Sequence, residues 1–404
     1  MLSQPDLLAI KGGQPVRSET MPARMALGPD EEKMIAECLA YYRERGEDPG
    51  YQGPFEQRYC DDFARFQGGG YADAVATGTV AVYVALAALG LSRGAEVICS
   101  PITDPGTLSA IILNGLVPRL ADSSPSSFNM GVEEFRARIT PEVKGVVIVH
   151  SLGRPAEIEA IVACAAVHGI RVVEDCSQAH GARVDGRPVG TFGDIAAFST
   201  MYRKAHITGA SGGVVFSRDE SLYHRALAHA DRGKPRWIEG FDDRNPAGFL
   251  FPALNLHTDE LSCAIGIASL ERLGDTIAQR LAFVRAVSAA IEAECKICRP
   301  YGYGSGDSPF VYPVLVDEAR LLCSPAEFAK AVQAEGIGLN PHYQYVASEW
   351  PFLQPHLADD LDTPNAQAVR NGSFCLYLNE NYGETEAADC ARAIAKVEGV
   401  FASP

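Results

Sequence analysis

The sequence predicts an α/β protein, with a large domain built on a mainly parallel sheet and a smaller α+β domain toward the C-terminus. Between about residues 71 and 217, short β-branched runs alternate with stretches of helical periodicity. After Pro300 the sequence pattern changes. It predicts first a loop rich in Gly, Tyr and Ser and then a strand followed by helices. Strands that are apolar on both faces and joined by helices are typical of parallel sheets.

The first of these regions predicts four strands and two helices. The strands fall at 96–99, 145–150, 170–174 and 195–198, and the helices at 80–89 and 157–167. Functional groups in such sheets gather at the carboxyl ends of the strands. Asp175, Ser199 and the loop after Ser100 are therefore expected at one edge of the sheet.

The C-terminal part predicts mostly helices. They are expected at 259–273, 276–293, 325–335 and 384–397, with a strand at 310–316. We expect a large domain of residues 25–270. The small domain would combine residues 1–24 with 271–404.

Composition limits the class of partner. The chain has 404 residues, of which 47% are hydrophobic and 21% charged, as in a compact enzyme. Its formal net charge of −16 gives a surface that repels nucleic acid and anionic membranes, so neither is expected as a partner. The start, MLSQPDLLAIKGGQ, has no signal-peptide pattern. The longest apolar stretch, 81–91, is about half the ~20 residues that span a membrane, so a cytoplasmic location is expected.

The eleven cysteines are scattered along the chain. Cys295 and Cys298 have CxxC spacing, but neither a second pair nor a histidine cluster completes a zinc site. We therefore expect buried reduced thiols and no metal.

Four side chains in a fixed order carry the chemistry. Asp175 and Gln178 close a β-branched run, and Ser199 and Lys204 follow about two dozen residues later. Pyridoxal phosphate needs such a set, because a lysine forms a Schiff base with its aldehyde and an acid pairs with its pyridinium nitrogen. The amide can hold the ring oxygen and the hydroxyl can hold the phosphate. Lys204 and Asp175 are thus the candidate catalytic residues.

A second candidate element is the triplet Thr77-Gly78-Thr79, which precedes the helix expected from about Val80. A small-residue turn that opens a helix presents free N–H groups and the positive end of the helix dipole to a phosphate. Such triplets are also ordinary helix caps.

Longer segments around these residues resemble the DegT/DnrJ/EryC1/StrS aminotransferases, which are pyridoxal-phosphate enzymes of fold type I acting on keto-sugars and keto-cyclitols. The matching segments are 174–182, 190–199, Lys204 and Gly212-Gly213, and the resemblance runs from about Leu8 to the 390s. It implies a seven-stranded, mainly parallel sheet in the large domain.

The resemblance also implies the cofactor contacts. Gly78, Thr79 and Ser199 would bind the phosphate, and Gln178 the ring oxygen. Asn255 would reach across a dimer interface to the partner's phosphate.

Three departures from the family pattern bear on the site, and the last two border the substrate pocket. His257 stands where the family has an arginine after that asparagine. Asp104 falls where the family places an aromatic side chain over the ring, so it is a candidate cofactor contact, the alternative being a cap on the following helix. The loop after Lys204 is one residue longer and carries Ala210-Ser211 in place of Gly-Glu.

The resemblance implies an aminotransferase that moves an amino group from glutamate or glutamine to a nucleotide-linked keto-sugar or a keto-cyclitol, as a homodimer with shared active sites. One alternative is a dehydratase of the same family, in which histidine replaces the lysine. The other is a non-catalytic homologue used for sensing or scaffolding. The presence of Lys204 and Asp175 weighs against both. Further candidates for contacts with a sugar are Tyr202, Arg203, His206, Arg232, Trp237, His342 and Tyr343.

Overall fold

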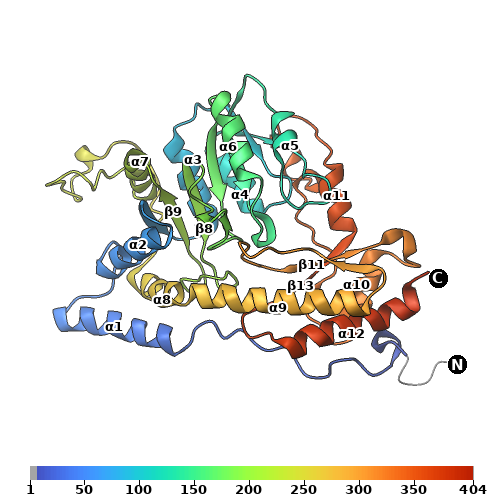
Figure 1. The fold of residues 1–404 in the computed structure, drawn as a ribbon. Coiled ribbons are helices and arrows are strands. Elements are labelled where there is room, and N and C mark those ends of the chain that lie inside the picture. Colours follow the sequence, from blue (N-terminus) through green and yellow to red (C-terminus); the bar gives the residue numbers. More distant parts are fainter. Residues whose placement is uncertain (1–6, 404) are drawn as a thin grey trace.

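A computed structural model describes residues 7–403 of the chain, and it contains a large sheet and a smaller one (Figure 1). The large sheet has seven strands in the order β1-β9-β8-β5-β4-β2-β3. Their bounds are β1 Tyr71–Val75, β2 Glu96–Cys99, β3 Val117–Leu120, β4 Val143–Val149, β5 Arg171–Asp175, β8 Ile195–Ser199 and β9 Gly213–Ser217. The predicted seven-stranded sheet is confirmed, and all four strands predicted individually are present.

The sheet is parallel from β8 through β5, β4 and β2 to β3. Only β9 reverses direction among its strands, and it pairs antiparallel with both β1 and β8. The carboxyl ends of β5 and β8 therefore lie side by side, with Asp175 paired to Ala197 in the register. Asp175 and Ser199 thus reach the same edge, as expected.

Helices cover both faces of this sheet (Figure 1). One face packs against α3, α4 and α7. The opposite face packs against α2 and α8 at one end and against α5 and α6 at the other. The helices of this part are α1 Pro29–Arg45, α2 Pro54–Phe66, α3 Gly78–Leu89, α4 Pro105–Leu113, α5 Val132–Arg136, α6 Ile158–Val167, α7 Glu220–Ala230 and α8 Glu260–Glu271. A hairpin of β6 (Arg183–Val184) and β7 (Arg187–Pro188) lies apart from the sheet.

The C-terminal part surrounds an antiparallel sheet of four strands in the order β10-β11-β13-β12. The strands are β10 Cys298–Pro300, β11 Tyr312–Val316, β12 Leu339–Asn340 and β13 Ser373–Leu376, and the helices are α9 Leu273–Glu294, α10 Pro325–Ala334, α11 Pro364–Asn371 and α12 Glu384–Phe401. The helices expected at 276–293, 325–335 and 384–397 and the strand expected at 310–316 appear here, and the helix expected at 259–273 is α8 of the large part.

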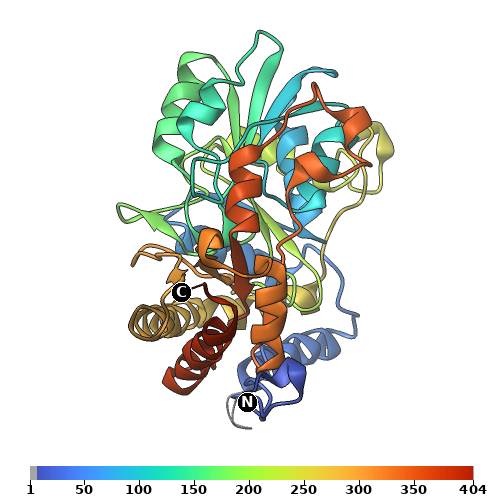
Figure 2. The same cartoon turned by 90° about the vertical axis from the view of Figure 1, so that its right-hand side faces the viewer.

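The beginning of the chain packs against this second core. Leu8 is buried in it, and Ala9 donates its backbone N–H to the Glu335 carboxylate at 2.8 Å. Figure 2 shows the N-terminal segment beside α12, where Arg17 pairs with Asp389 at 2.7 Å. These contacts join the N-terminal segment to the C-terminal part, and residues 1–6 of the predicted grouping lie outside the described residues. The exact domain boundaries stay a prediction.

One C-terminal stretch returns to the large domain. Ala347 and Leu353 are buried in the core between the large sheet and α3, and Ala347 donates its N–H to Pro101 at 2.8 Å. Among residues 7–403, no helix combines the length and the apolar character that crossing a membrane requires.

Candidate active site

A cavity of about 1260 Å³ opens at the carboxyl edge of the large sheet, between the two cores. It is lined by residues of both parts and by the N-terminal segment. All but one of the predicted site residues line it, namely Gly78, Thr79, Asp104, Asp175, Gln178, Ser199 and Lys204.

The N-terminus of α3 forms one wall. The Thr77 hydroxyl caps this helix by accepting a hydrogen bond from the Val80 N–H at 3.0 Å. The Gly78 and Thr79 N–H groups precede the first intrahelical bond, so they are free to bind an anion. A Cβ on Gly78 would stand 2.4 Å from the Ser199 Cβ, which shows how closely the serine approaches the helix end. Main-chain donors, a helix dipole and a hydroxyl converge here, and this donor set fits a phosphate.

Asp175, at the end of β5, is held by one hydroxyl and one backbone N–H group. It is only 4% exposed. Its Oδ2 accepts from the Thr107 hydroxyl at 2.9 Å, and its Oδ1 accepts from the Ser177 N–H at 3.1 Å. Thr103 donates in turn to Thr107 at 2.8 Å. The carboxylate is therefore fixed in direction and can pair with a cationic nitrogen inside the cavity.

Lys204 lies in a loop without regular secondary structure, yet its side chain is buried. Burial lowers the pKa of Lys204 from 10.5 to about 8, and the negative charges of Asp175 and Asp104 oppose the shift. The Nζ atom lies 4.4 Å from the centroid of the Phe310 ring. A sizeable fraction of this amine is therefore neutral near pH 8, as a nucleophile requires.

Gln178 projects into the cavity from the loop after β5. Its Oε1 accepts from the Leu152 N–H at 2.7 Å, which fixes the amide orientation. Its Nε2 faces the Tyr343 hydroxyl at 3.5 Å. The amide N–H₂ group is therefore the part of Gln178 that could donate to a ligand in the cavity, and its contact with the ring oxygen stays a prediction.

Asp104 caps α4, which was the alternative interpretation of this residue. Its Oδ1 accepts from the Gly106 N–H at 2.8 Å. The side chain is exposed and also lines the cavity. The helix cap is present, while a contact with the cofactor ring stays a prediction.

Asn255 lies outside the cavity lining of its own chain, on the exposed surface. Its Oδ1 accepts from the His257 N–H at 3.4 Å, and its backbone bridges to Asp231. His257, at the family's arginine position, points to the buried Asp231 carboxylate, with an Nε2–Oδ2 distance of 3.2 Å. An exposed asparagine is available to a second subunit, as the predicted role requires.

Of the further candidates for contacts with a sugar, some line the cavity and others do not. Tyr202, Arg203 and Tyr343 line the cavity. His206 is fully buried behind it and bonds to the Tyr59 hydroxyl at 2.6 Å, so its role is structural. The rest lie outside the lining among the described residues, namely Arg232, Trp237 and His342.

Several residues of the cavity were not predicted. Thr107 supports Asp175, and the spacing of Thr103 and Thr107 around a helix start was the available signal. Phe310, Arg24 and Arg280 also line the cavity, and the Lys204 Nζ lies over the Phe310 ring. Their sequence neighbourhoods carry no motif, because only tertiary folding brings them to the lysine.

One buried group of residues has metal-ligand chemistry, within the part of the chain that the structure describes: His150, Glu174 and Cys176. The Glu174 carboxylate already accepts three backbone N–H bonds, from Gly190, Phe192 and Gly193, each at 2.7 Å. It also accepts from His150 at 3.2 Å. These bonds give the group a structural role, in anchoring the 190–193 loop. All eleven cysteines are free thiols.

Comparison with known proteins decides the family. The model of the DegT/DnrJ/EryC1/StrS aminotransferase family matches residues 36–395. The chain belongs to this family. The predicted family and enzyme class are therefore confirmed.

The names of curated relatives describe enzymes that act on sugars and cyclitols. A putative L-glutamine:3-amino-2,3-dideoxy-scyllo-inosose aminotransferase of Streptoalloteichus tenebrarius is 31% identical over 379 residues, which cover 87% of this chain and 86% of the relative. GDP-perosamine synthase of Escherichia coli O157:H7 is 35% identical over 229 residues. This second match spans 57% of this chain and only 61% of the relative.

Solved structures agree with the fold. An aminotransferase from Psychrobacter cryohalolentis superimposes with a TM-score of 0.84 at 26% identity, covering 95% of this chain and 98% of that one. The E. coli GDP-4-keto-6-deoxy-D-mannose-3-dehydratase with bound hydrated PLP shares the fold, with a TM-score of 0.82 at 20% identity and coverage of 95% and 99%. The predicted fold and the pyridoxal-phosphate cofactor are confirmed.

Proposed function

We propose that this protein transfers an amino group from glutamate or glutamine to the carbonyl carbon of a keto-sugar or keto-cyclitol. The observation that carries the proposal is the meeting of Lys204, Asp175 and the N-terminus of α3 in one cavity. These groups come from three separate elements, and together they match the amine, acid and phosphate contacts that the cofactor needs.

Pyridoxal phosphate, when bound, supplies an aldehyde that condenses with amines and a ring that withdraws electrons from the neighbouring carbon. Lys204 would hold the aldehyde carbon through Nζ until the donor amine replaces it. The freed Nζ would then take the proton from the α-carbon of the donor as general base. Its lowered pKa suits this task, because the base must be neutral when it accepts the proton.

Asp175 would keep the ring nitrogen protonated by pairing with it. The bonds from Thr107 and Ser177 orient the carboxylate for that contact. Gln178 would donate to the ring oxygen, since its carbonyl is already occupied by Leu152. Asp104 would lie beside the ring or a substrate hydroxyl.

The phosphate would sit at the N-terminus of α3, with Gly78, Thr79 and Ser199 as donors. Asn255 of a second subunit would complete this site, so the active form is a homodimer. The exposure of Asn255 and its separation from its own cavity support this arrangement.

The acceptor would bind in the outer part of the cavity. Several tyrosine side chains line the cavity, including Tyr202, Tyr343, Tyr345 and Tyr377. Aromatic faces with polar edges suit the apolar faces and hydroxyl edges of a sugar or cyclitol ring. The named relatives with inosose and perosamine chemistry support the same substrate class.

The test is a half-reaction assay. Wild-type protein with bound pyridoxal phosphate is mixed with glutamate or glutamine, and the release of the corresponding 2-oxo acid is measured. A panel of inososes and nucleotide-linked keto-sugars then identifies the acceptor. Lys204→Ala should lose all transfer, while Lys144→Ala, which removes an exposed amine, should keep it. Release of the 2-oxo acid together with a sugar product that has lost a hydroxyl and gained no amino group, the donor nitrogen leaving as ammonia, would indicate the dehydratase. Absence of both reactions would indicate the non-catalytic homologue.

A further inference from the structure

The loop that carries Lys204 needs support from outside, because its own backbone bonds are few. Lys204 donates its N–H to Met201 and Thr208 donates to Thr200, both at 2.9 Å. On the α8 side, Ile207 donates its N–H to the Ser269 hydroxyl at 3.0 Å. These contacts leave the carbonyl groups on either side of Lys204 to other partners.

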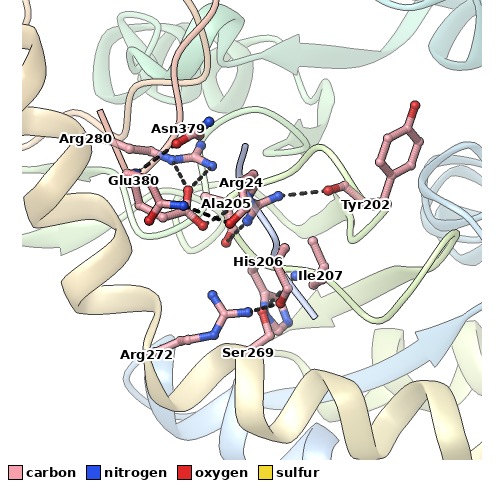
Figure 3. Close-up of polar contacts among 12 residues, drawn as sticks. Arg24, Tyr202, Ala205, His206, Ile207, Ser269, Arg272, Arg280, Asn379 and Glu380 are labelled. Carbon is pink, nitrogen blue, oxygen red and sulfur yellow. Dashed lines mark hydrogen bonds and ion pairs between the residues drawn. The ribbon is translucent and has the colours of Figure 1, made fainter. Parts of the chain in front are cut away.

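Arg24 binds both of those carbonyl groups (Figure 3). Its Nη1 donates to the Tyr202 oxygen at 2.8 Å, and its Nη2 donates to the Ala205 oxygen at 3.1 Å. The two acceptors bracket Lys204 in the sequence. A planar guanidinium that spans them fixes the separation and direction of the two peptide groups.

A half-buried acid, Glu380, holds the guanidinium of Arg24 in turn. Its Nε donates to the Glu380 Oε1 at 2.8 Å. The other oxygen of Glu380 accepts from Arg280 Nη2 at 2.9 Å and from its Nε at 3.2 Å. Arg280 is only 1% exposed. One carboxylate therefore sits between two arginines, and each guanidinium has little freedom to turn away.

The backbone of Arg24 is held from the same side. Asn379 donates to the Pro22 carbonyl at 2.9 Å. Asn381 donates to the Ala23 carbonyl at 2.8 Å and to that of Arg24 at 3.0 Å. The N-terminal segment is thus fixed between the 379–381 loop and the Lys204 loop.

We propose that Arg24 is a positioning residue, which holds the Lys204 loop in the form that places Nζ over the cofactor site. This inference rests on the proposed role of Lys204, but its structural part concerns the loop alone. Arg24 acts through the Tyr202 and Ala205 carbonyls and contacts no reacting atom in this arrangement.

The chain offers a matched control in Arg17. It lies on the same N-terminal segment and pairs with Asp389 at 2.7 Å and with Glu386 at 3.2 Å. It also bonds to carbonyl groups, those of Glu19 and Thr20, but these belong to its own segment. Arg17→Ala therefore removes an equivalent anchor between the N-terminal segment and the small domain without touching the Lys204 loop.

The experiment measures hydrogen exchange of the full-length holoenzyme, together with kcat and KM. In Arg24→Ala we expect the amides of Lys204 and Thr208 to exchange at least about tenfold faster, which corresponds to losing hydrogen bonds from a charged donor. We expect kcat to fall by a similar factor with a smaller change in KM. Arg17→Ala should leave the exchange of these amides and kcat at wild-type values. Arg24→Lys keeps the charge but cannot span two carbonyls, so its exchange rates and kcat should lie between those of Arg24→Ala and the wild type. It serves as the test if Arg24→Ala does not fold.

Two outcomes would overturn the inference. One is wild-type exchange at Lys204 and Thr208 in both Arg24 variants. The other is an equal acceleration in Arg17→Ala, since that would assign the effect to the whole N-terminal segment. Different results would contradict the proposed function itself. These are a wild-type protein that transfers no amino group, or borohydride reduction that labels a lysine other than Lys204.

Discussion

Replacing Gly78 with alanine would place a methyl carbon inside the contact between α3 and Ser199. The new Cβ would lie 2.4 Å from the Ser199 Cβ, 2.8 Å from its Oγ and 2.9 Å from its Cα. One of these neighbours is backbone, so rotation of the serine side chain cannot relieve the clash. The end of α3 must move away from β8, and overpacking of this kind costs about 1–3 kcal/mol. If the cost falls on the phosphate site, the dissociation constant for pyridoxal phosphate rises roughly 5- to 150-fold.

Cofactor titration followed by visible absorbance measures this effect. The control is Gly274→Ala, because Gly274 also lies in the first turn of a helix, α9, but a Cβ there meets nothing within 4 Å. We expect wild-type affinity in the control, with equal or slightly higher thermal stability. Gly78→Ala with unchanged affinity and unchanged thermal stability would refute the placement of the phosphate against this helix end.

Three other predictions follow from the site. Asp175→Asn should fold and bind cofactor but lose about 10- to 1,000-fold in turnover, because a neutral amide no longer raises the pKa of the ring nitrogen; near wild-type kcat in a steady-state assay would remove the acid from the mechanism. Covalent labelling of Lys204 in cofactor-free protein, by pyridoxal phosphate and borohydride at a series of pH values, should rise as pH increases through about 8, because only the neutral amine reacts and burial lowers the pKa of Lys204 from 10.5; a midpoint near that of the exposed Lys144 would contradict the burial of Nζ. Asn255→Ala should weaken cofactor binding about 10-fold or more through loss of a hydrogen bond to a charged group, and hybrid dimers with Lys204→Ala should regain one active site per dimer, whereas inactive hybrids would show that Asn255 does not act across the interface.

Most of the sheet and the first half of the site could be predicted from the sequence, because both depend on local patterns. The β-branched runs marked the strands, and the strand ends located Asp175 and Ser199. Lys204 follows β8 closely in the chain, so residues that are near it in the sequence motif are also near it in space. The reversed direction of β9 left no such local mark.

The support of the site was hidden from sequence analysis for a physical reason. Phe310 and Arg24 reach Lys204 only after the two cores assemble, and no spacing rule links such distant segments. Asp104 illustrates the opposite limit, since the same residue type and position suit both a helix cap and a ligand contact. The structure shows that Asp104 accepts a hydrogen bond from the Gly106 N–H, which the residue type and its position alone could not predict.

The contacts that hold the Lys204 loop through Arg24 also determine the order in which parts of the enzyme can fold during synthesis. Residues 22–24 are translated more than 350 residues before Asn379 and Asn381, the asparagines that hold their backbone. The large domain can therefore form its sheet while the loop around Lys204 is still unfastened. Cofactor capture by a fully ordered site therefore has to wait until the 379–381 loop has been synthesised and has packed against residues 22–24.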